Sequence, residues 1–171
     1  MARQSDSETP DSDPRRPAEL DELDLRILAV LREQGRISVP QLAETVHVSR
    51  ATAYVRLRRL HELDVVRGFA AVVNPMRAGT TVSALVLVKS AQPGHRRWTR
   101  WKEQLEAIDA VEYAAMVAGD TDVFVLLRVR DHEELRRVLL EQIQDIEYVG
   151  STQTLLILDE IVKRPYVVPS G

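Results

Sequence analysis

The second half of the chain alternates between two hydrophobic periods in a fixed order, and this order restricts the fold more than any other feature of the sequence. Residues 82–88 (VSALVLV), 111–117, 123–129 and 154–162 are short apolar runs typical of strands. Helical patterns lie between the first two runs and again before the last. The order strand, helix, strand, strand, helix, strand predicts an α+β, ferredoxin-like domain, with a four-stranded antiparallel sheet and both helices on one face.

Separate signals mark the two helices of this domain. Trp98, Trp101, Leu105 and Ile108 recur at helical spacing. The two tryptophans could instead form a platform on which bases stack, but their spacing with Leu105 favours packing on the sheet. The second helix is expected to begin after Asp131, which can act as its N-cap.

The region from Leu20 to Leu63 predicts three short helices around a small core. Asp21, Ser38 and Ser49 each stand where an N-cap is expected. His47 occupies the turn before the third helix, where a left-handed backbone is needed. A metal or catalytic role is the alternative for His47. Two short helices joined by such a turn predict a (winged) helix-turn-helix domain.

The third helix leaves a basic surface outside its apolar face. In a helix-turn-helix the first residues of this helix enter the major groove, where Ala51 and Thr52 permit close approach. Arg50 is the expected base reader because arginine pairs bidentately with guanine, and the later arginines are expected to clamp phosphates. The alternative is a solvated face. The predicted DNA-binding residues are Ser49, Arg50, Ala51, Thr52, Tyr54, Val55, Arg56, Arg58 and Arg59.

Composition excludes several other classes of function. With 23 basic and 26 acidic residues the net charge is −3, so any nucleic-acid site must be local. The absence of cysteine excludes disulfides, thiolate metal sites and a cysteine nucleophile. The four histidines show no ligand pair at helical spacing, and neither a nucleophile elbow nor a phosphate-binding glycine loop is present. We therefore expect no catalytic residue, no cofactor and no metal.

No apolar run is long enough for a membrane helix, and the N-terminus is polar rather than a basic-then-apolar signal, so we expect a soluble, unexported protein. The expected organisation is a flexible tail (1–19), a helix-turn-helix domain (20–64), a strand and linker (65–79), a second domain (80–164) and a C-terminal tail (165–171).

Several short motifs occur in a characteristic order. They are Leu20-Asp21-x-x-Asp24-x-x-Ile27-Leu28, Gln41-Leu42-Ala43, Ser49-x-x-Thr52, Arg56-Leu57-x-Arg59-Leu60, Val66-Arg67-Gly68-Phe69, Asn74-Pro75, Gly119-Asp120-x-Asp122 and Thr152-x-Thr154. In this order and spacing, from about Leu20 to Lys163, the chain resembles the Lrp/AsnC family, the leucine-responsive or feast/famine transcription regulators of bacteria and archaea.

This resemblance implies a cytoplasmic, nucleoid-associated regulator that binds pseudo-palindromic promoter sites on double-stranded DNA. It further implies dimers through the C-terminal RAM (ACT-like) domain, often assembled into larger even-numbered homo-oligomers, and a small effector, commonly an amino acid, held between RAM domains. The positions that match the family's effector site are Gly119, Asp120, Thr121, Asp122, Thr152 and Thr154. Backbone N–H groups near Gly119 would hold a carboxylate, and Asp120 or Asp122 an ammonium group.

The chain also departs from the family pattern. Val123 replaces an aromatic residue after the second aspartate, His47 replaces a glycine, and Glu147-Tyr148-Val149-Gly150 replaces the usual Pro-Gly-Val. From the residue types alone, 119–122 favour a plain β-turn, and the same loop can serve both purposes. Two other functions remain open: an enzyme similar to the sirohaem decarboxylases that resemble this family, and an architectural DNA-binding protein without an effector.

Overall fold

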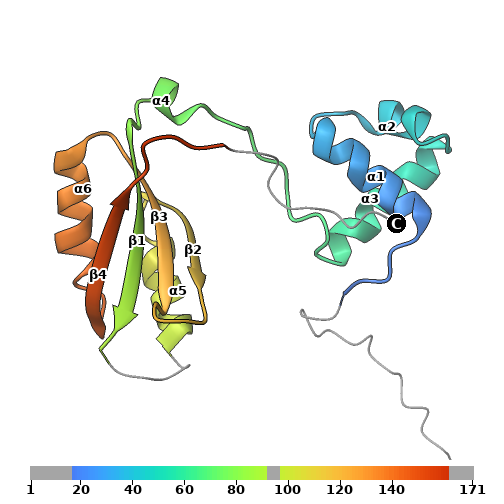
Figure 1. Cartoon of the computed structure of the whole chain (residues 1–171). Coiled ribbons are helices and arrows are strands. Elements are labelled where there is room, and N and C mark those ends of the chain that lie inside the picture. Colours follow the sequence, from blue (N-terminus) through green and yellow to red (C-terminus); the bar gives the residue numbers. More distant parts are fainter. Residues whose placement is uncertain (1–16, 92–96, 162–171) are drawn as a thin grey trace, which may run out of the picture. The chain divides into compact units, whose positions relative to one another are not determined.

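The computed structural model describes residues 17–91 and 97–161. The chain divides into two compact units, with the boundary between Ala71 and Val72 (Figure 1). Each unit has its own hydrophobic core. No helix within the described ranges combines the length and the apolar character needed to cross a membrane.

The first unit contains the three expected helices. They are α1 (Glu22–Glu33), α2 (Val39–Thr45) and α3 (Arg50–Glu62). The predicted N-caps Asp21, Ser38 and Ser49 are confirmed, since each side chain accepts a hydrogen bond from the backbone N–H three residues later. Such caps satisfy N–H groups that a helix leaves without a partner, and so fix where each helix begins.

The core of this unit lies where the three helices meet. Ile27 from α1, Leu42 from α2 and Leu60 from α3 have no exposed surface. His47, in the turn between α2 and α3, has a φ of 58°. The predicted left-handed turn at His47 is therefore confirmed, and the helix-turn-helix geometry follows from it.

The prediction of a strand within residues 65–79 is wrong. Residues 65–74 have no regular structure, and a single helical turn, α4 (Pro75–Ala78), follows them. Asn74 caps this turn by accepting from the N–H of Arg77 at 3.1 Å, and Gly79 ends it with a φ of 97°. A strand needs a neighbouring strand to satisfy its backbone, and the part of the chain that the structure describes places none beside this segment.

The second unit is the predicted ferredoxin-like fold. Its elements are β1 (Val82–Ser90), α5 (Arg97–Glu106), β2 (Val111–Met116), β3 (Val123–Val129), α6 (His132–Val138), the π-helical turn η1 (Leu139–Ile143) and β4 (Val149–Leu156). The strands form one antiparallel sheet in the order β2-β3-β1-β4 (Figure 1). Strand β4 is therefore an edge strand, and it runs beside β1.

One face of this sheet is covered and the other is open. Alternate residues of β1 and β3, such as Val86 and Val125, are buried in one cluster with side chains of α5 and α6. Trp101 and Leu105 belong to this cluster, which confirms that the tryptophan helix packs on the sheet. The intervening residues turn to the open face, which is rich in apolar side chains. On the open face lie Leu85, Leu87, Tyr113, Phe124, Leu126 and Leu155.

The last strand begins earlier than expected. The sequence predicts a strand over 154–162, whereas β4 spans Val149–Leu156. Its first half is polar because an edge strand keeps one side accessible to water, so hydrophobicity alone does not reveal it. Thr152 and Thr154 consequently lie inside the strand, with Thr152 opposite Val88 of β1.

Candidate functional sites

Helix α3 carries the predicted DNA-binding residues, and its start is well ordered by side chains. The hydroxyl of Ser49 accepts from the N–H of Thr52 at 3.1 Å and lies 2.8 Å from the Thr52 hydroxyl. Ala53 and Leu60 point into the core without exposed surface. The remaining positions of the helix are thereby fixed relative to that core.

A continuous stripe of α3 is exposed. Ala51, Val55 and Arg58 follow one another at i, i+4 and i+7, and Arg50 and Tyr54 lie beside them. Tyr54 and Val55 are 57% and 51% exposed. We call these five residues the α3 stripe. It offers small, apolar, aromatic and cationic groups together, which is the mixture that reads base edges and thymine methyl groups in a major groove.

The two arginines of the α3 stripe keep their charge accessible. In the described part of the chain Arg58 pairs only with Glu62, at 3.3 Å, and both side chains are more than half exposed, so this pair is weak. Within the residues that the structure describes, Arg50 forms no ion pair or side-chain hydrogen bond. Both guanidinium groups are therefore available to DNA.

Arg56 and Arg59 lie toward α1 and have hydrogen-bond partners there. The guanidinium of Arg59 donates to Asp24 at 2.5 Å and to the carbonyl of Glu19 at 2.9 Å. Arg56 donates to Asp21 at 2.5 Å and to Asp24 at 3.3 Å. Asp24 has no exposed surface. The phosphate-clamp role predicted for Arg56 and Arg59 therefore competes with ion pairs inside the unit.

The charges of this network stabilise one another. The N–H of Asp24 and the guanidinium of Arg56 hold the pKa of the Asp21 carboxyl below its usual range. The Asp21 carboxylate in turn raises the pKa of Arg56. The side chains of Asp21 and Arg56 are thus both charged at neutral pH.

The loop that resembles the family's effector motif is fastened to β1. The carboxylate of Asp122 accepts from the N–H of Ser90 at 2.7 Å, and the N–H of Asp122 donates to the carbonyl of Val88 at 3.1 Å. Gly119 has a φ of 148°, a conformation that side chains disfavour. Asp120 is exposed, and Thr121 is partly exposed. The turn interpretation and the ligand interpretation both remain compatible with this geometry.

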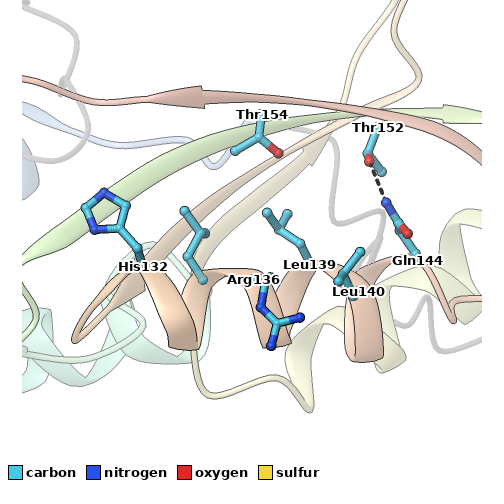
Figure 2. A pocket seen from close by; sticks show the side chains of 8 residues that line it. His132, Arg136, Leu139, Leu140, Gln144, Thr152 and Thr154 are labelled. Carbon is cyan, nitrogen blue, oxygen red and sulfur yellow. Dashed lines mark hydrogen bonds between the residues drawn. The ribbon is translucent and has the colours of Figure 1, made fainter.

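The two predicted threonines line a pocket of about 230 Å³ between β4 and the α6–η1 helix (Figure 2). Its lining residues are His132, Leu135, Arg136, Leu139, Leu140, Gln144, Thr152 and Thr154. The side-chain amide of Gln144 donates to the hydroxyl of Thr152 at 3.3 Å. Hydroxyl, amide and imidazole groups lie beside leucine side chains in this lining, so the pocket suits a small polar molecule with an apolar side chain.

The predicted effector residues thus fall into two groups. Thr152 and Thr154 line this pocket, and the loop 119–122 does not. The loop and Thr152 nevertheless lie at the same end of β1, because Val88 pairs with Thr152 on one side and its carbonyl accepts from the N–H of Asp122 on the other. Sequence reasoning missed the helical part of the lining. The available signal was the spacing of His132, Arg136 and Leu139 along one helical stripe.

Comparisons with known proteins agree with both units. Residues 20–61 match the AsnC-type helix-turn-helix domain, and residues 83–167 match the Lrp/AsnC ligand binding domain. An HTH-type transcriptional regulator of Pyrococcus abyssi is 34% identical over 83% of this chain and 88% of its own length. The proline dehydrogenase transcriptional activator of Rhizobium radiobacter is 34% identical over 84% of this chain and 92% of its own.

A solved structure shows the same arrangement of elements. The crystal structure of the Mycobacterium tuberculosis leucine response regulatory protein, LrpA, is similar with a TM-score of 0.78 and 29% identity. The match covers 88% of this chain and 100% of that one. The similarity therefore includes both units and the elements that carry the α3 stripe and the pocket.

Proposed function

Because the chain belongs to the Lrp/AsnC family of transcriptional regulators, we propose that α3 recognises promoter DNA and that the second unit adjusts this binding in response to a small molecule. The relatives are transcriptional regulators, so the decarboxylase alternative is set aside. Because a transcriptional regulator binds chromosomal DNA, we propose that the protein is located at the nucleoid in the cytoplasm of a bacterium or archaeon.

The α3 stripe is the observation that carries the DNA proposal. Arg50 at its start is the proposed base reader, and Arg58 is the proposed phosphate contact. Ala51 and Val55 supply apolar contacts, while Ser49 and Thr52 fix the start of the helix and Tyr54 lies beside Arg50 and Arg58.

A second copy of the chain is the proposed partner in DNA recognition. The open face of the sheet is apolar, and one helix-turn-helix makes few base contacts, so pairing about a two-fold axis serves both needs. Two α3 helices would then read half-sites about 34–36 Å apart in a pseudo-palindrome. Larger even-numbered assemblies are proposed on the family resemblance.

Selection of binding sites from random DNA tests this function. Wild-type protein is expected to enrich a pseudo-palindromic sequence. On that sequence Arg50→Ala should cost about 1–3 kcal/mol of binding free energy, with little loss on a random duplex. Arg58→Ala should weaken both and reduce the salt dependence by about one phosphate contact. Equal losses for Arg50→Ala on both duplexes would remove it from base reading.

The effector proposal rests on the threonine-lined pocket and the adjoining loop. We propose that Thr152 and Thr154, with Gly119, Asp120, Thr121 and Asp122 at the same end of the sheet, bind an amino acid where two copies meet. The related M. tuberculosis protein is named for its response to leucine, which fits the leucine side chains that line the pocket. An effector changes DNA binding only if it favours one assembly state, typically by about 1–3 kcal/mol.

A thermal-shift screen of the twenty amino acids, followed by gel shifts with each hit, tests the effector proposal. A hit should raise the melting temperature of the wild type and change its DNA affinity. If none of them acts at millimolar concentration, the effector-free architectural function is favoured instead.

A further inference from the structure

The N-terminal turn of α1 and the middle of α3 share one closed electrostatic network. Asp21 and Asp24 form a capping box in which each side chain accepts from the other's backbone N–H, at 2.9 and 3.2 Å. The same two carboxylates accept from Arg56 and Arg59. The cap of one helix is thereby joined to the side of another.

The burial of Asp24 makes this network costly to open. The Asp24 carboxylate has no exposed surface, and two guanidinium groups take the place of its water. Arg59 is further fixed by its bond to the Glu19 carbonyl. A phosphate would have to compete with a desolvated carboxylate for Arg59, whereas it meets no such competitor at Arg58.

The network also faces away from the α3 stripe. Arg56 and Arg59 stand three residues apart on the side of α3 toward α1, with side chains only 30% and 39% exposed. Arg58, which falls on the opposite flank, is 60% exposed. The helix thus divides its cations into one group for the interior and one for solvent.

We propose that Asp24 is a positioning residue for DNA recognition: by holding Arg56 and Arg59 it sets the orientation of α3 against α1 and withholds two cations from the phosphate backbone. This inference rests on the proposed DNA-binding function. Non-specific affinity for DNA comes almost entirely from cationic contacts with phosphate. Because the network keeps two arginines from making such contacts, it lowers non-specific affinity and so favours discrimination between sequences.

Replacement of the buried carboxylate by its amide tests the proposal. Asp24→Asn keeps the shape of the side chain and removes the charge that holds Arg59, while Arg56 keeps its bond to Asp21. Binding to a short random-sequence duplex, measured by fluorescence anisotropy over a range of KCl, should become tighter at low salt. The slope of log K against log[KCl] should become steeper by about one, as Arg59 gains a phosphate contact. The preference for a duplex selected by the wild type should fall.

A matched variant separates this effect from a general change of charge. Glu22→Gln, in the same turn of α1, alters the net charge by the same amount, and among the described residues Glu22 pairs only with exposed Arg26. It should leave the slope unchanged. A merely structural role for Asp24 would lower the folded fraction, followed by circular dichroism, without steepening the slope of the folded protein.

The arginines provide a second test that does not depend on the folding of Asp24→Asn. In the wild-type background, Arg56→Gln and Arg59→Gln should leave the salt slope unchanged. A decrease of about one for either would show a direct phosphate contact and overturn the inference. An unchanged slope in folded Asp24→Asn would overturn it as well. Failure of the wild type to bind either duplex would instead refute the DNA-binding function, and the inference with it.

Discussion

The carboxylate of Asp122 accepts the backbone N–H of Ser90 at 2.7 Å, and this bond fastens the loop between β2 and β3 to the end of β1. The register between β1 and β4 shifts at the same point, between Lys89 and Ser90. On the other side of β1, Asp122 satisfies a backbone donor that lies beyond the last pair between β1 and β3, Val88 with Val123. Its neighbour Asp120 is exposed and makes no such bond among the described residues.

This difference predicts separate effects for the two aspartates. Asp122→Ala should lower the free energy of unfolding by about 0.5–1.5 kcal/mol through loss of the bond to Ser90. Asp120→Ala should leave stability within about 0.5 kcal/mol. Urea denaturation measures both. If Asp120 holds the ammonium group of an effector, Asp120→Ala should reduce ligand-induced stabilisation, and an unchanged ligand response would place the ammonium site elsewhere.

The hydroxyl of Thr152 provides a test of the pocket. Thr152→Val keeps the volume of the side chain and removes the acceptor for Gln144. Because this bond is solvent-exposed, stability should change by less than about 0.5 kcal/mol, while the thermal shift caused by an amino-acid hit should be lost. Ser151→Val, one residue earlier and therefore on the opposite face of β4, is the matched control and should retain the thermal shift.

The sequence predicted those elements whose formation depends on local signals. The three N-caps of the first unit and the left-handed turn at His47 are decided within a few residues of the chain. The order of the sheet elements followed from short apolar runs at β1, β2 and β3 and from the helical patterns between the strands. Both kinds of prediction hold because the tertiary contacts favour the same conformations as the local sequence.

Features that depend on a distant neighbour were less visible. The apolar residues around Val72 are typical of a strand, but a strand forms only beside another strand. The polar start of β4 at Val149 is set by pairing with β1. The direction of Arg56 and Arg59 depends on Asp24, more than thirty residues earlier. The helical pattern alone predicts that these arginines form a solvated face or contact DNA, and it does not reveal their ion pairs with α1.

The open face of the sheet predicts a monomeric variant. Leu155 is paired with Leu85 on this face and is 44% exposed in the single chain, so Leu155→Asp opens no cavity in the core. A charge within this apolar interface should favour the monomer at micromolar concentration, as measured by light scattering, and weaken binding to the pseudo-palindrome. Thr99→Asp, on an exposed position of α5, should remain dimeric. A wild type that is monomeric with full DNA affinity would contradict the dimer proposal.

Glu134 predicts a dependence of stability on acid pH. It accepts from the backbone N–H of Arg130 at 2.8 Å and from the guanidinium of Arg130 at 3.0 Å. The guanidinium contact, then the backbone bond, lowers the pKa of Glu134 from 4.5 to about 2. Since the folded state favours the charged carboxylate, the stabilisation is complete above the ordinary pKa and is lost as the pH falls from about 4.5 toward 2. Thermal melts of the wild type should therefore show a loss of stability in this window.

Glu134→Gln provides the comparison for that pH dependence, because its amide does not titrate. The difference in melting temperature between the wild type and Glu134→Gln should be largest at neutral pH and should shrink as Glu134 becomes protonated. Glu133→Gln is the control, since Glu133 lies one residue earlier on the same helix and its side chain is exposed, without the contacts to Arg130. High salt should reduce the difference only in part, because it screens the guanidinium but leaves the hydrogen bond to the backbone of Arg130 intact. A difference that stays constant from neutral pH to pH 2 would show that the carboxylate charge contributes nothing to the fold.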